Sequence, residues 1–321
     1  MYALVAYLAQ ARLDAAGILC AVGLAVCVAL WGLALQFSPE REAAQLASAL
    51  PPLPMTLAAG GPRPFVILAY QRTGSNLLCG RLHNHARVVM HNELFNVAKI
   101  WTYQNEDVRA DPTWKWDLFS RDADPCGFLA DVYTRPSVTK PHAGAAGFKL
   151  FPDHWTSSNQ LALRQLLADP RVAKVILHRQ NVLRVYVSKL RADKTGLYLC
   201  RPLDGVRVHV EPASLAAFTE HYKQVYEFYD VCVTGQAVHR VSYDELASPA
   251  TADGAVRGVL RFLLGVDCDK PPPPLPVTVR QSAAPLRQGV TNYEELREAF
   301  KHHPLLRRCF EEEETDGEEM F

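Results

Sequence analysis

Residues 65–78 read FVILAYQRTGSNLL, and this stretch decides the fold. The six apolar residues Phe65–Tyr70 are typical of a strand that is buried on both faces of a sheet. The polar turn Gln71–Ser75 follows and leads into a helical pattern from about Asn76 to His85. A buried strand, a tight turn and a helix in this order are typical of an α/β protein with a parallel sheet.

The rest of the chain repeats this alternation of strands and helices. Apolar runs at 146–151, 172–178 and 237–241 predict further strands. Helical patterns lie near them, at about 157–168, 181–192, 212–230 and 254–265. The sequence therefore predicts an α/β fold in which helices flank a parallel β-sheet. Residues 92–139 are rich in Trp, Asp, Arg and Pro and predict irregular structure with short helices.

The turn after the first strand has the composition of an anion site. A helix N-terminus directs backbone N–H groups and the positive end of its dipole at one point. Gly74 permits a close approach of the backbone, Thr73 and Ser75 supply hydroxyl groups, and Arg72 supplies fixed charge. The alternative is a simple turn in which Ser75 caps the helix. Neither G-x-x-x-x-G-K-S/T nor G-x-G-x-x-G occurs here, so the turn lacks the residues that bind a magnesium–triphosphate or a dinucleotide.

An uncharged apolar segment precedes the folded domain. As a helix, residues 15–37 would be about 35 Å long, which exceeds the ~30 Å hydrocarbon core of a bilayer. We expect a transmembrane signal-anchor helix there, after a short segment at 1–14 and before a Pro/Gly-rich stem at 38–63. A cleaved signal peptide is the alternative, although its apolar region spans only about 7–15 residues. Arg12 and Arg41 flank the segment, so charge alone leaves its orientation open.

Composition limits the remaining possibilities. The chain has 321 residues, of which 49% are apolar, and this is enough for one substantial core. Residues 311–321 hold seven acids and no base, and they predict a disordered tail. No basic cluster indicates nucleic-acid binding. Outside the apolar segment six cysteines remain without zinc-site spacing, and they allow one or two disulfides whose pairing stays open: Cys79, Cys126, Cys200, Cys232, Cys268 and Cys309.

Four segments resemble those of sulfotransferases that use 3′-phosphoadenosine 5′-phosphosulfate (PAPS). Residues 65–78 resemble the 5′-phosphosulfate loop, and most closely the loop Q-R-S/T-G-S-T-L-L of the carbohydrate-sulfating branch related to bacterial trehalose sulfotransferase. Residues 147–150 resemble the G-x-K-L/M strand of that branch. Arg179–Leu183 with Ser188 and Ala192 resembles the 3′-phosphate motif R-x-N-x-L…S…A, and residues 290–296 resemble a C-terminal element. The resemblance covers roughly residues 64–300 and implies a P-loop-like sulfotransferase domain at 64–310.

The resemblance also implies how the donor is bound. Arg72, Thr73, Gly74, Ser75 and Asn76 would hold the 5′-phosphosulfate of PAPS. Two further residues, Arg179 and Ser188, would hold the 3′-phosphate. The product would be adenosine 3′,5′-bisphosphate, and no metal is required. Taken without the loop, the sequence favours Arg179 as a surface charge at a strand end and Ser188 as a tolerated polar residue of a helix.

The catalytic residues are expected in two places. Arg72 and Lys149 are candidates for stabilising the charge of the leaving phosphate, because positioning and electrostatics dominate transfers of this kind. In the related branch the general base is a Glu that precedes aromatic residues, and Glu93 occupies the corresponding place after Arg87–Met90. Partial burial beside Phe95 would make Glu93 more basic. His91 is the second candidate for the base.

The resemblance implies an enzyme of the Golgi membrane. It would be a single-pass type II protein, with residues 1–14 cytoplasmic and the catalytic domain in the lumen. The acceptor would be a hydroxyl group of a carbohydrate, since Trp101, Tyr103, Trp114 and Trp116 are able to stack on sugar rings, although they are equally compatible with the core. Two alternatives remain: a catalytically inactive glycan-binding protein with the same fold, and a P-loop phosphotransferase.

Overall fold

The computed structural model describes residues 50–102, 111–135, 137–198, 203, 205–265 and 285–318. Its strands are β1 (Arg63–Ala69), β2 (Val88–Met90), β3 (Ala145–Leu150), β4 (Ala173–His178) and β5 (Val238–Ser242). Its helices are α4 (Ser75–His83), α6 (Leu118–Ala123), α7 (Pro125–Thr134), the short 3₁₀ helix η1 (Pro152–His154), α8 (Gln160–Ala168), α9 (Val182–Thr195), α10 (Pro212–Cys232), α11 (Tyr243–Ala247), α12 (Ala252–Leu264), α13 (Leu286–Gly289), α14 (Tyr293–Ala299) and α15 (Pro304–Glu318).

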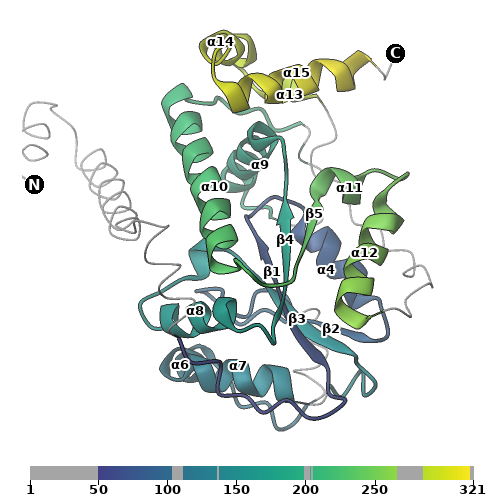
Figure 1. Cartoon of the computed structure of the whole chain (residues 1–321). Coiled ribbons are helices and arrows are strands. Elements are labelled where there is room, and N and C mark those ends of the chain that lie inside the picture. The colour runs from purple at the N-terminus through teal and green to yellow at the C-terminus, as the bar shows by residue number, and fades with distance from the viewer. Residues whose placement is uncertain are drawn as a thin grey trace, which may run out of the picture.

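The strands form one parallel sheet in the order β2-β3-β1-β4-β5 (Figure 1). The chain leaves β1 towards β2 on one side and leaves β4 towards β5 on the other side. Ligands of open α/β sheets bind where neighbouring strands diverge in this way, outside the carboxyl ends of the strands. We refer to the ends of β1 and β4 as the switch point.

Helices cover both faces of the sheet (Figure 1). On one face α4 and α12 pack over alternate residues of β1 such as Phe65 and Ile67. On the other face α7, α8 and α10 pack over Val66 and Leu68. Because β1 is buried on both faces, it needs a continuous apolar sequence rather than an alternating one. The predicted α/β architecture with a flanked parallel sheet is confirmed.

Three tyrosines of α10 hold the switch point together. The hydroxyl of Tyr226 donates to the carbonyl of Leu177 (2.7 Å) and accepts from the N–H of Tyr70 (3.2 Å), so it joins the ends of β4 and β1. The hydroxyl of Tyr222 bonds both the N–H and the carbonyl of Arg179. The hydroxyl of Tyr229 donates to the end of β1 (3.3 Å). These bonds tie the backbone at the ends of β1 and β4 to α10.

The predictions for the terminal segments fall partly outside the described residues. The predicted membrane span at 15–37 lies outside the described residues, as do residues 38–49 of the predicted stem. Among the described residues, no helix is both long and apolar enough to cross a bilayer. At the other end α15 extends into the acidic segment as far as Glu318. In that segment Glu312 accepts a hydrogen bond from Asn181, which ties it to the start of α9.

The described cysteines do not form disulfides. None of Cys79, Cys126, Cys232 and Cys309 is disulfide-bonded, while Cys200 and Cys268 lie outside the described residues. Burial raises the pKa of Cys79 and of Cys232 to about 12, so both remain protonated at neutral pH. The possible disulfides allowed by the sequence are therefore not found among these four cysteines.

Candidate functional site

The turn between β1 and α4 has a left-handed backbone at two positions. Arg72 has a φ of 69° and Gly74 a φ of 86°. A non-glycine residue in this region carries strain, and such strain is concentrated at functional sites. Gly74 is the N-cap of α4, and no side chain caps this end of the helix. The alternative in which Ser75 caps the helix is wrong, because Ser75 is its first helical residue.

The first turn of α4 is therefore a suitable place for an anion. Backbone N–H groups at an uncapped helix start have no intrahelical acceptor, and alternating backbone conformations direct such groups into a concave anion site. Thr73 braces this turn from within, since it is fully buried and its hydroxyl donates to the carbonyl of Tyr70 (2.7 Å). The structure therefore gives Thr73 a bracing bond where the sequence predicted a donor to the ligand.

Replacing Gly74 by Ala should destabilise the domain and distort this turn. A Cβ at Gly74 would lie 2.4 Å from a ring carbon of Tyr243, and the left-handed backbone would add about 1–2 kcal/mol of strain. Gly235→Ala is a matched control, because Gly235 has a φ of 76° and open space around it. We expect thermal unfolding to show a larger drop in Tm for Gly74→Ala. Equal drops for the two variants would mean that the contact with Tyr243 has no effect.

The side chain of Arg72 points towards α9. Its Nε donates to Ser188 Oγ (3.0 Å) and its Nη1 donates to the carbonyl of Tyr198 (2.8 Å). Burial lowers the pKa of Arg72, and the nearby Asp193 partly offsets this effect. The structure thus brings together Arg72 and Ser188, two residues that the sequence assigned to different phosphates of the donor.

Arg179 lies beside this pair, directly after β4. Its side chain is buried, its guanidinium stacks 4.1 Å from the ring centre of Tyr243, and its Nη1 lies 3.5 Å from the carbonyl of Arg72. Tyr243 is the first residue of α11, and the same ring also lies against Gly74. One aromatic ring therefore positions both the turn and Arg179. The interpretation of Arg179 as an exposed surface charge is wrong, since only 7% of it is accessible.

On the other side of the turn, Lys149 connects α4 with the segment after β2. Lys149 is fully buried in β3, and its Nζ donates to Asn76 Oδ1 (2.5 Å) in the first turn of α4. The same Nζ lies 3.0 Å from Glu93 Oε1. Lys149, Asn76 and Glu93 thus form a continuous chain of polar contacts. The sequence assigned all three residues to one site but predicted no contact between them.

The ionisation of Glu93 differs from the expected one. Burial by itself would raise the pKa of Glu93, but the imidazole of His154, the charge of Lys149 and the amide of Asn96 together lower it to about 2. Asn96 Nδ2 donates to Glu93 Oε2 at 2.8 Å. The expectation that burial makes Glu93 more basic is therefore wrong, because its polar partners outweigh desolvation. Glu93 is ionised at neutral pH and is a weak base.

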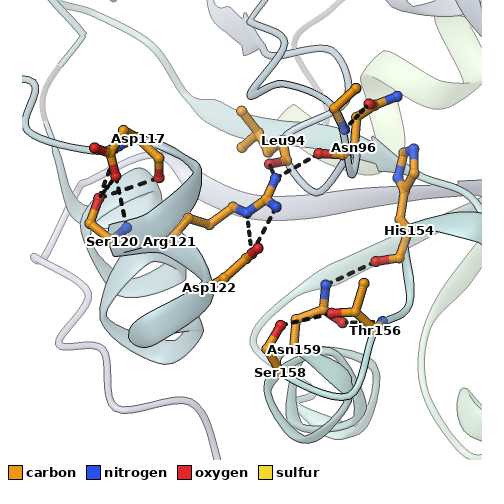
Figure 2. A network of polar contacts seen from close by, with 11 residues as sticks. Leu94, Asn96, Asp117, Ser120, Arg121, Asp122, His154, Thr156, Ser158 and Asn159 are labelled. Carbon is orange, nitrogen blue, oxygen red and sulfur yellow. Dashed lines mark hydrogen bonds and ion pairs between the residues drawn. The ribbon is translucent and has the colours of Figure 1, made fainter.

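Arg121 holds the backbone of the segment that carries Glu93. It extends from α6, is 1% exposed, and donates through Nη1 to the carbonyls of Leu94 (3.0 Å) and Asn96 (2.8 Å) (Figure 2). Its Nε donates to Asp122 (2.7 Å). The sequence analysis missed Arg121 because α6 and the segment at Glu93 lie far apart along the chain.

His91 lies apart from this group. Its side chain is buried and lines a small cavity with Trp114 and Arg135. Alternate residues of a strand point to opposite faces of a sheet, and His91 continues the face of Val89, which lines the same cavity. The structure does not bring His91 to Glu93 and Lys149.

The tryptophans also separate into two groups. Trp114 and Trp116 pack against the core, and the indole N–H of Trp116 donates to Asp131 (2.6 Å). Trp101 is 41% exposed, and the ammonium group of Lys99 lies 4.5 Å from its ring centre. Tyr103 lies outside the described residues. Of the four aromatic residues suggested for sugar stacking, Trp101 alone among the described ones has an accessible ring next to the segment of Glu93.

Comparisons with known proteins give limited information. No family model matches the chain, and no curated protein matches it. A crystal structure of a sulfotransferase from Alicyclobacillus acidocaldarius is similar over 74% of this chain and 95% of its own, with 18% sequence identity and a TM-score of 0.39.

Proposed function

We propose that this chain is a sulfotransferase that moves a sulfuryl group from PAPS to an acceptor hydroxyl. One observation supports this most: an uncapped helix start and a cluster of Arg72, Arg179 and Ser188 lie at the same switch point. The turn suits a phosphosulfate, and the two arginines with a serine suit a separate phosphate. A donor with charged groups at both ends matches this pair of sites, and the four sequence segments resemble those of enzymes that use PAPS.

In this proposal each residue of the site contacts a particular part of PAPS. The α4 start with Gly74, Ser75 and Asn76 would bind the phosphosulfate end. Arg179 and Ser188 would bind the 3′-phosphate, and Arg72, which contacts Ser188, would lie between the two ends. Lys149 would stabilise charge on the leaving phosphate from behind Asn76. PAPS supplies the activated sulfuryl group, and the residues supply orientation and charge.

The proposed step forms one bond and breaks one bond at sulfur. The acceptor oxygen bonds to sulfur while the bond from sulfur to the phosphate oxygen breaks, and the hydroxyl proton moves to Glu93. A carboxylate with a pKa near 2 takes a proton poorly from an ordinary alcohol. The hydroxyl becomes strongly acidic as its oxygen bonds to sulfur, so the proton would move late in the step. Glu93 meets the first requirement of such a base, because it is ionised at neutral pH.

The acceptor and the location belong to the same proposal. A carbohydrate hydroxyl suits the exposed ring of Trp101 beside the Glu93 segment. A Golgi type II protein anchored through residues 15–37 would meet such acceptors in the lumen. The support for this location is the apolar sequence and the resemblance stated above.

Binding and transfer assays on the full-length chain test the proposed function. We expect calorimetry to show adenosine 3′,5′-bisphosphate binding at least 10-fold more tightly than adenosine 5′-monophosphate, since charge-assisted hydrogen bonds contribute about 1.5–3 kcal/mol. Radiolabelled PAPS with a panel of glycans, lipids and peptides would then identify the acceptor. The proposal is wrong if the bisphosphate does not bind. Magnesium-dependent hydrolysis of ATP would favour a P-loop phosphotransferase instead.

A further inference from the structure

His154 is a buried histidine behind the carboxylate of Glu93. It lies at the end of η1, directly after β3, and it is 1% exposed. Its backbone carbonyl accepts from Asn159 Nδ2 (2.9 Å), and the side-chain oxygen of Asn159 accepts from the N–H of Thr156 (2.9 Å) (Figure 2). The ring of His154 packs 5.1 Å from that of Phe151. These contacts fix the backbone and the ring of His154.

The hydrogen bonds of the ring determine its tautomer. Nδ1 lies 3.3 Å from the backbone N–H of Phe151 and accepts from it. A neutral imidazole that accepts at Nδ1 carries its hydrogen on Nε2. Nε2 is buried and has no hydrogen-bond partner within the described residues, and it lies 3.5 Å from Glu93 Oε2. His154 therefore presents an N–H donor to Glu93 and has no free lone pair with which to take a proton from it.

We propose that His154 is a positioning residue, which fixes the Glu93 carboxylate by directing Nε2–H at Oε2. Oε1 faces Lys149 at 3.0 Å and Oε2 also accepts from Asn96, so the three contacts hold both oxygens of the carboxylate. A carboxylate held on both oxygens keeps one orientation towards the acceptor hydroxyl. The role of His154 towards the acceptor rests on the proposed function, whereas its effect on Glu93 does not.

The charged and titratable groups around this pair come from three elements. Lys149 of β3 lies 3.0 Å from Glu93 Oε1, and Asp153 of η1 lies 4.0 Å from His154 Nε2. Cys79 of α4 is buried beside Lys149 and Glu93, and burial keeps its thiol protonated. Asp153 is 59% exposed, so solvent screens its effect on the imidazole. Lys149 and His154 are thus the two groups that act most directly on the protonation of Glu93.

The test measures the protonation state of Glu93 in two variants of His154. His154→Leu removes the donor and keeps an apolar side chain in a buried position, whereas His154→Gln retains an amide donor. The full-length chain would carry glutamate labelled with ¹³C at the carboxylate carbon, and loss of one signal in Glu93→Gln would assign Glu93. The signal is followed from pH 7 to pH 4 without donor or acceptor. Asp153→Asn is the matched control.

We expect the Glu93 signal of the wild-type chain to stay in its ionised position down to pH 4. A lost donor raises the pKa of a carboxylate, so His154→Leu should shift the signal towards the protonated position at pH 4. The His154→Gln and Asp153→Asn variants should behave like the wild type. In transfer assays kcat of His154→Leu should fall about 10-fold with KM for PAPS unchanged, as for a misplaced catalytic group. The Gln variant should recover most of this loss.

Two outcomes would overturn the proposal. The first is a Glu93 signal in His154→Leu that matches the wild type at every pH. The second is a His154→Gln variant that behaves like His154→Leu, which would show that the volume of the ring matters rather than its donor. If His154→Leu shifts the Glu93 signal but no form of the chain transfers sulfate, the positioning contact is correct and the proposed function is wrong.

Discussion

Glu93→Gln is expected to lower kcat for sulfuryl transfer by about 10²–10⁴-fold, the usual contribution of a positioned acid–base group. Glutamine keeps the shape of the side chain and an oxygen that accepts from Lys149, but it cannot take the proton of the acceptor. The affinity for adenosine 3′,5′-bisphosphate should remain that of the wild type. Glu93 contacts Lys149 and lies outside the cluster of Arg72, Arg179 and Ser188 that is proposed to bind the 3′-phosphate. Transfer from radiolabelled PAPS and calorimetry measure the two effects separately.

Asp153→Asn is the control for this experiment. Asp153 is an exposed carboxylate in the same region, 4.0 Å from His154, and it has no contact with Lys149 among the described interactions. We expect Asp153→Asn to retain full activity. A Glu93→Gln variant with near-normal kcat would assign proton removal to another group. It would also show that the ion pair of Glu93 with Lys149 is structural.

Arg179→Ala should raise KM for PAPS by about 10–100-fold, since each charge-assisted hydrogen bond contributes about 1.5–3 kcal/mol. The effect should depend on the extra phosphate. The wild-type chain should distinguish adenosine 3′,5′-bisphosphate from adenosine 5′-monophosphate, and Arg179→Ala should lose most of this preference. The KM for the acceptor should not change. Steady-state kinetics with both substrates varied and calorimetry with both nucleotides provide the measurement.

Arg240→Ala controls for the loss of positive charge. Arg240 lies in β5 with a side chain that is 53% exposed and paired with Asp230, so its removal should leave both constants unchanged. Arg179→Lys keeps the charge but loses the planar fork, and it should recover only part of the affinity. If Arg179→Ala weakens the two nucleotides equally, Arg179 supports the shape of the site and does not bind the 3′-phosphate.

The sequence predicts the architecture well because its signals are local. The apolar run at 65–70 and the helical pattern at 212–230 correspond to β1 and α10 with shifts of one or two residues at their ends. The acidic segment is less accessible to such reasoning, since a tertiary contact such as that of Asn181 with Glu312 is absent from any local pattern. The acidic composition of residues 311–321 predicts a solvated segment. It gives no sign of a helix that begins at Pro304 and continues into these residues.

The site is predicted less completely, because its geometry depends on contacts between distant segments. The turn at Arg72–Ser75 is visible in the sequence, yet the direction of the Arg72 side chain towards Ser188 is not. Tyr243 follows β5 directly and His154 lies four residues after β3, so the strand order would have placed both near the carboxyl edge. The sequence contains 11 histidines and does not reveal which of them faces Glu93. The low pKa of Glu93 depends on that neighbour together with Lys149 and Asn96.

The three tyrosine hydroxyls of α10 have a consequence for ligand selection. A single rigid helix is tied to the backbone at the end of β1 and to that at the end of β4, so the spacing between the turn and Arg179 is set by the helical repeat. Under the proposed function, this helix would fix the interval between the two anion sites. We expect a molecule with two anionic groups at the matching interval to engage both sites, and a shorter or longer molecule to engage only one of them.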